Sequence, residues 1–93
     1  MKFMMSYSWT PDPQRRAEGL ARFARSGGVP PHGIRLLGRW TAADLGSGFA
    51  LVETEDPGRL AEFAYQWSDL MALDFAPVLD DAQLAAVLPR AAG

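Results

Sequence analysis

Ile34-Arg-Leu-Leu-Gly-Arg-Trp-Thr41 and Gly48-Phe-Ala-Leu-Val-Glu-Thr54 are the two stretches of sequence that decide the fold. In each stretch, apolar side chains recur at every second position, which is typical of a half-buried β-strand. The polar, Gly-rich segment Ala43-Asp-Leu-Gly-Ser47 lies between them and predicts a turn. The two stretches together therefore predict a β-hairpin.

The sequence before the hairpin predicts a strand followed by a helix. Lys2 to Trp9 alternates larger apolar residues with smaller or polar ones, as a half-buried strand does. Thr10-Pro-Asp-Pro13 then supplies a hydroxyl or a carboxylate for an N-cap, and a proline suited to the first helical turn. Gly19 is unfavourable inside this helix, so we expect close approach to the sheet there. Gly27-Gly28 supplies the positive φ that ends many helices.

The sequence after the hairpin predicts a second helix, a fourth strand and a short C-terminal helix. Asp56-Pro57 offers the second helix a capping carboxylate and a proline at its first position. Ala72 to Val78 has the alternation of a strand, and Asp80-Asp81-Ala-Gln83 resembles a capping box. We expect the C-terminal helix to stop before Pro89. The apolar stripe of the second helix has helical spacing and consists of Leu60, Phe63, Ala64 and Trp67.

This order of elements places the chain in the α+β class. We expect residues 1–93 to form a single ferredoxin-like βαββαβ domain with a four-stranded antiparallel sheet and a short C-terminal helix. Both main helices should cover one face of the sheet. A chain of 93 residues leaves no room for a second core.

The alternation divides the sheet into two faces, and both are largely apolar. The face expected beneath the helices carries Phe3, Met5, Tyr7, Trp9, Ile34, Leu36, Trp40, Phe49, Leu51, Leu73 and Phe75. The opposite face is expected to carry Met4, Ser6, Ser8, Leu37, Arg39, Ala50, Val52, Thr54, Ala76 and Val78. No third layer is available to cover it, and exposed apolar patches usually mark contacts. We therefore expect a homodimer in which two sheets face each other across a two-fold axis.

Composition and charge exclude several classes of protein. Nine basic and eleven acidic residues give a formal net charge of −2, and no basic stripe of the kind that binds nucleic acid is present. No segment approaches the ~18 apolar residues of a membrane span, so a cytoplasmic protein is the expectation. The chain has no cysteine, which removes disulfides and thiolate metal ligands. Met1 to Ser6 begins like a signal peptide, but its apolar stretch ends too soon.

A family resemblance appears in several of these segments. The chain resembles a small bacterial family, domain-of-unknown-function family 3303, which is related to the dimeric α/β-barrel superfamily. The resemblance implies the ferredoxin-like fold and a face-to-face dimer, and it implies no activity. Members often carry a His after the Trp of the second segment, where this chain has Thr41. The segments that carry the resemblance are Met1-Lys-Phe-Met4, Leu37-Gly-Arg-Trp40, Gly48-Phe-Ala-Leu-Val-Glu-Thr54, Trp67-Ser-Asp-Leu70 and Pro77-Val-Leu-Asp80.

Aromatic residues supply the candidate ligand pocket. Tyr7, Trp9, Trp40 and Trp67 are all expected in the layer between sheet and helices, where they could line a cavity for a flat molecule. The simpler interpretation is a filled core, because each buried aromatic side chain covers 150–250 Å². Asp69, just beyond Trp67, is the best-placed carboxylate for an acid–base role; otherwise it is an ordinary polar residue near a helix C-terminus.

The remaining candidate residues concern the dimer face and a loop. The dimer-face candidates are Met4, Leu37, Arg39, Val52, Asp74 and Val78. On that face Arg39, Glu53 and Asp74 are expected to form ion pairs between subunits, or to bind a polar ligand. His32 could be an acid–base group or a heme ligand, but we interpret it as an exposed loop residue. We expect no metal site and no cofactor, since no cluster of metal-ligating residues is present.

Function is much less constrained than fold. The leading hypothesis is a homodimer that binds a small apolar or aromatic molecule beneath its helices. One alternative is a cofactor-independent enzyme that resembles the antibiotic-biosynthesis monooxygenases and acts on a flat aromatic substrate. Another is a purely structural or regulatory dimer whose aromatic residues only fill the core.

Overall fold

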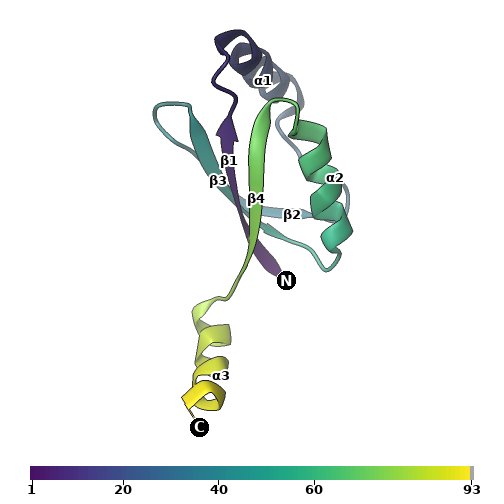
Figure 1. The fold of residues 1–93 in the computed structure, drawn as a ribbon. Helices are drawn as coiled ribbons and strands as arrows, with labels where there is room; N and C mark the ends of the chain where they lie inside the picture. Colours follow the sequence, from purple (N-terminus) through teal and green to yellow (C-terminus); the bar gives the residue numbers. More distant parts are fainter. Residues whose placement is uncertain (93) are drawn as a thin grey trace.

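The computed structural model describes residues 1–92, which form a four-stranded sheet and three helices (Figure 1). The sheet is antiparallel throughout and its strand order is β2-β3-β1-β4, which confirms the α+β, ferredoxin-like βαββαβ topology. The elements are β1 (Lys2–Trp9), α1 (Pro13–Ser26), β2 (Arg35–Thr41), β3 (Ser47–Glu53), α2 (Pro57–Trp67), β4 (Met71–Val78) and α3 (Asp81–Ala92).

The first two helices begin where their capping residues predict. The carboxylate of Asp12 accepts a hydrogen bond from the backbone N–H of Gln14 at 3.0 Å, with Pro13 in the first turn of α1. Asp56 does the same for α2 through Gly58, at 2.9 Å. Helix α1 ends at Gly27, whose φ of 71° is left-handed and whose N–H donates to a carbonyl of the last turn.

Both α1 and α2 pack on the same face of the sheet. Phe63 and Trp67 of α2 belong to one buried cluster with Phe3 and Met5 of β1. Gly19 is the only buried residue of α1, and a Cβ atom there would lie only 2.9 Å from Cε3 of Trp9. The expected close approach of this helix to the sheet is therefore present, and it depends on the missing side chain.

The register of β3 corrects the expected assignment of its two faces. Val52 lies opposite Phe3 and Ala50 opposite Met5, so both lie beneath the helices, where they are fully buried. Phe49 and Leu51 instead lie on the open face, the sheet surface that α1 and α2 leave uncovered. The alternation along β3 is as predicted, but the prediction that its larger residues, Phe49 and Leu51, face the core is wrong. Side chains from β1 already fill that space, so β3 contributes the small residues. Thr54, also expected on the open face, is buried.

A β-bulge in β2 corrects two further assignments. The pairing with β3 shifts between Leu36 and Gly38, which makes Leu37 an extra residue in the strand. Beyond the bulge Arg39 lies opposite Ala50, on the helix face, and Trp40 lies opposite Phe49, on the open face. Both are the reverse of the prediction, because one extra residue reverses every later side chain in a strand.

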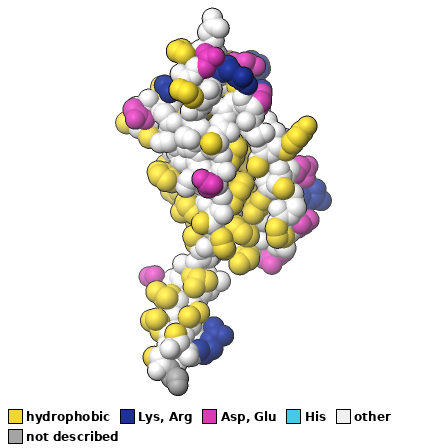
Figure 2. All heavy atoms as spheres, in the orientation of Figure 1, with side chains coloured by type: hydrophobic (Ala, Val, Ile, Leu, Met, Phe, Trp, Pro, Cys, Tyr) yellow, Lys and Arg dark blue, Asp and Glu magenta, His cyan; other side chains and the backbone are white. Residues whose placement is uncertain are grey.

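Helix α3 projects away from the sheet (Figure 1). The predicted capping box is present: Asp80 N donates to Oε1 of Gln83, and Gln83 N donates to Oδ1 of Asp80. The expected end before Pro89 is wrong, because Pro89 lies inside the helix. Pro89 has no backbone N–H to donate to the carbonyl four residues earlier in the helix. Because α3 has no buried residue, water can bind that carbonyl instead. Figure 2 shows hydrophobic side chains along this isolated helix.

None of the helices in residues 1–92 combines the length and the apolar character needed to cross a lipid bilayer.

Candidate functional site: a pocket between the helices and the sheet

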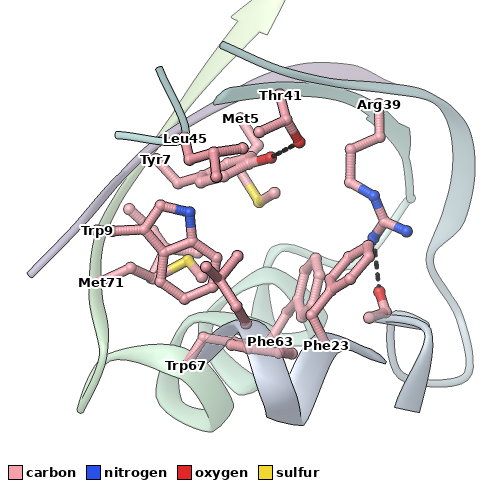
Figure 3. Close-up of a pocket in the computed structure, with 13 residues that line it drawn as sticks. Met5, Tyr7, Trp9, Phe23, Arg39, Thr41, Leu45, Phe63, Trp67 and Met71 are labelled. Atoms are coloured by element: carbon pink, nitrogen blue, oxygen red, sulfur yellow. Dashed lines mark hydrogen bonds between the residues drawn. The ribbon is translucent and has the colours of Figure 1, made fainter. Parts of the chain in front are cut away.

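A pocket of about 220 Å³ lies between α1, α2 and the helix face of the sheet (Figure 3). Its floor comes from β1, β2 and β4, and its walls come from the two helices. One side opens to solvent. The lining residues are Met5, Tyr7, Trp9, Leu20, Phe23, Gly28, Arg39, Thr41, Leu45, Phe63, Trp67, Met71 and Leu73. Nearly all of these side chains are apolar or aromatic, so the pocket favours molecules with a large apolar surface.

Three aromatic side chains form one wall of the pocket. The ring centroids of Tyr7 and Trp9 are 6.4 Å apart, and those of Trp9 and Trp67 are 6.3 Å apart; both pairs are T-shaped. This edge-to-face geometry is favourable for aromatic rings. The guanidinium of Arg22 lies 5.4 Å from the ring centroid of Trp67. These contacts order the three rings before any ligand arrives.

Arg39 gives the pocket its charge. Because of the bulge, its side chain crosses the helix face of the sheet and reaches the end of α1. There Nη1 donates to the Gly28 carbonyl at 2.8 Å and Nη2 to the Gly27 carbonyl at 2.9 Å. The guanidinium also lies 4.6 Å from the ring centroid of Phe23, within the range of a cation–π contact. Figure 3 shows it at the side of the pocket opposite Trp9.

Two hydroxyl groups lie along the sheet side of the same pocket. The Tyr7 and Thr41 hydroxyl oxygens are 3.4 Å apart, and the Tyr7 hydroxyl is 3.5 Å from the Trp40 carbonyl oxygen. Both distances are long for O–H···O bonds, which are commonly 2.5–3.0 Å. These hydroxyls are only weakly engaged, so they remain free to bind a ligand atom.

Asp69 does not line this pocket. Its carboxylate pairs with Arg22 of α1, with Nη1–Oδ1 at 3.1 Å and Nη2–Oδ2 at 2.9 Å. The hydrogen-bonded guanidinium lowers the pKa of Asp69 from its usual value and raises the pKa of Arg22. Asp69 is therefore a weaker base than an ordinary aspartate. It borders a second hollow of about 650 Å³, which is broader, more open and more polar than the first.

The structure brings together some of the predicted pocket residues and separates others. Tyr7, Trp9 and Trp67 line the pocket as a group. Trp40 lies on the open face of the sheet and is 59% exposed, so its predicted place in the pocket is wrong. Phe23, Arg39 and Thr41 also line the pocket, although the sequence pattern does not predict them there. Gly38 was the available signal, because a glycine inside a strand often marks a bulge.

Some of the dimer-face candidates lie on the open face of the sheet, and others lie on the helix face. Met4, Asp74 and Val78 lie on the open face, as their register with β1 and β3 shows. Leu37 is the exposed extra residue of the bulge. Val52 and Arg39 lie on the helix face, so the expected cross-subunit pairing of Arg39 is wrong. Glu53 instead faces Arg35 of its own chain, with Nη1 and Oε1 3.8 Å apart.

His32 is exposed in the loop between α1 and β2, as expected. Within residues 1–92, no three His, Cys, Asp or Glu side chains gather in an arrangement that could hold a metal ion.

Fold and pocket together define a small ferredoxin-like protein with an apolar cavity beneath its helices and an uncovered sheet face. The chain belongs to the family described as Domain of unknown function (DUF3303), whose model matches residues 1–92. The solved structure titled "Structure of Rv0793 from Mycobacterium tuberculosis" is similar in fold, with a TM-score of 0.53 and 16% sequence identity. That match covers 88% of this chain and 99% of the other. Among curated proteins, no sequence matches this chain.

Proposed function

We propose that this protein binds a small aromatic molecule in the pocket between its helices and its sheet. The observation that carries the proposal is the aromatic wall of Tyr7, Trp9 and Trp67 beside an open cavity. These rings belong to the buried core, and they also border a cavity that they leave unfilled. Flat aromatic ligands gain from edge and face contacts with such rings.

The size of the pocket limits the ligand to one or two fused rings. Its volume of about 220 Å³ is below the usual range of roughly 300–1,000 Å³ for drug-sized ligands. A cavity of about 150 Å³ is nevertheless enough to hold benzene. A bicyclic molecule with one end at the solvent opening therefore suits the available space.

Binding accounts for the pocket better than the enzyme alternative does. Catalysis by a cofactor-independent enzyme would call for an acid–base group with a shifted pKa in contact with the substrate. None of the 13 residues that line the pocket is an Asp, a Glu or a His, the side chains that most often act as general acids and bases. A purely structural role would not account for the cavity, because unfilled space beside core side chains lowers stability.

We also propose that the protein is a homodimer joined through the open face of the sheet. That face exposes Trp40 and Phe49, which are 59% and 51% exposed. Leu51 of β3 and Met4 of β1 lie opposite each other on the same face. Large exposed aromatic side chains in contiguous positions are typical of an interface, and a copy of the same face is complementary to it across a two-fold axis.

Nuclear magnetic resonance can test ligand binding with reporters that the chain already contains. Trp9 and Trp67 line the pocket, whereas Trp40 lies on the opposite face of the sheet. We expect naphthalene-based ligands to shift the indole N–H signals of Trp9 and Trp67 and to leave that of Trp40 in place. Equal shifts of all three signals, or none, would contradict a specific pocket. A Trp40→Phe variant assigns the control signal.

A further inference from the structure

The pocket lining carries a positive charge and several hydrogen-bond donors but no negative charge. Arg39 is the only charged side chain among the 13 lining residues, and no acidic residue accompanies it. The other polar side chains are the hydroxyls of Tyr7 and Thr41 and the indoles of Trp9 and Trp67. Indole N–H and guanidinium groups can only donate hydrogen bonds, and hydroxyls can donate as well as accept. The lining therefore offers many donors and no anionic acceptor.

The charge of Arg39 is not neutralised by the protein. None of the ion pairs found in residues 1–92 includes this side chain. Its two hydrogen bonds go to the carbonyls of Gly27 and Gly28, which are neutral acceptors. Guanidinium has five N–H donors, so donors remain after these two bonds. A half-buried cation beside an apolar cavity favours an anionic partner, because the apolar lining screens charge less than bulk water does.

The guanidinium is also fixed in position. The carbonyls at the end of α1 hold one edge of the group, and the ring of Phe23 lies against it at 4.6 Å. In Figure 3 the guanidinium lies across the cavity from the ring of Trp9. A ligand with rings against the aromatic wall and a carboxylate at the other end would meet both groups at once. Since Arg39 is already ordered, binding would cost little side-chain entropy there.

We propose that the pocket selects aromatic carboxylates over neutral aromatic molecules of the same shape, with Arg39 binding the carboxylate. This inference rests on the proposed function, because it assigns a ligand class to the same pocket. Carboxylates suit guanidinium particularly well, since two parallel N–H···O bonds can form. The competing interpretation is that Arg39 only ties the end of α1 to the sheet, which would give no preference between charged and neutral ligands.

The test compares naphthalene-1-carboxylate with naphthalene-1-carboxamide, which differ in charge and hardly in shape. Affinity is measured from the indole signals of Trp9 and Trp67 at pH 7. We expect the carboxylate to bind about tenfold more tightly, as a charge-assisted hydrogen bond implies. Equal affinity for the two ligands would overturn the anion preference and leave the proposed function standing. If neither ligand binds, the proposed function itself fails.

Variants then assign the preference to one side chain. Arg39→Gln should weaken carboxylate binding much more than amide binding, so that the two affinities come within about twofold of each other. Arg39→Lys should retain a preference, since it keeps the charge. Arg35→Gln is the matched control on the same strand, because Arg35 is exposed and outside the pocket lining. If Arg39→Gln keeps the full preference, or if Arg35→Gln removes it, Arg39 is not the carboxylate partner.

Discussion

Gly19 permits the contact on which the packing of α1 depends. A methyl group at this position would overlap the ring of Trp9, which is held in turn by Tyr7 and Trp67. The ring therefore has little freedom to move aside. We expect Gly19→Ala to lower the free energy of unfolding by about 1–2 kcal/mol, because overpacking outweighs the gain in helix propensity. Urea denaturation measures the difference.

The exposed residue Ala21 of the same helix provides the control for helix propensity. Ala21→Gly should cost about 1 kcal/mol through propensity alone. If Gly19→Ala stabilised the protein instead, the close approach of α1 to Trp9 would be wrong.

Arg22 and Asp69 form an ion pair that connects α1 to the segment after α2, and its contribution to stability depends on pH. The pKa of Asp69 is lowered in the folded protein, so the contribution of the pair is complete above the ordinary aspartate pKa and disappears as pH falls through the lowered value. Both side chains are partly exposed, which limits the contribution to about 0.2–1 kcal/mol. We expect Asp69→Asn to destabilise the protein by this amount at pH 7, and by less at pH 3, which lies below the ordinary aspartate pKa of about 3.9.

Denaturation at the two pH values provides the measurement, and the partner residue provides the control. Arg22→Gln should cause a similar loss at pH 7, and the double variant should lose less than the sum of the two. An equal loss at both pH values would show that the aspartate acts through packing and not through its charge.

At the scale of elements, short-range signals in the sequence predicted where α1 and α2 begin, whereas the facing of the strands depended on contacts between residues far apart in the sequence. The starts of α1 and α2 could be predicted because an Asp and a Pro act on their own helix, within a few residues. The orientation of β3 could not, because it depends on which side chains of β1 fill the core. The bulge at Leu37 likewise changed the predicted site, since it decides whether Arg39 or Trp40 faces the pocket.

Helix α3 contributes nothing to the core of its own chain. It has no buried residue, and Leu84 and Leu88 are 44% and 55% exposed. We therefore expect deletion of residues 80–93 to change the free energy of unfolding of the isolated protomer by less than about 0.5 kcal/mol. Urea denaturation at high dilution measures this. A larger loss would mean that α3 packs against its own sheet in solution.

At the scale of the whole molecule, the two faces of the sheet have different tasks in our proposals. The helix face encloses the pocket, and the open face joins two copies. We expect light scattering to give a dimer at tens of micromolar, and Phe49→Glu to give a monomer, because a charge at an apolar interface is costly. Tyr65→Glu is the control, since Tyr65 is 84% exposed on α2. A monomeric parent protein, or a dimeric Phe49→Glu variant, would contradict the proposed interface.

The extra residue at Leu37 makes β2 tolerant of a change in length as well as in composition. In the gene, losing its codon would remove the bulge and leave every other residue of the strand opposite its present partner in β3. Arg39 would still face the pocket, and Trp40 would stay on the open face. A point substitution at Leu37 changes only one exposed side chain. Loss of the same three nucleotides and their exchange therefore both preserve the set of residues that face the binding site.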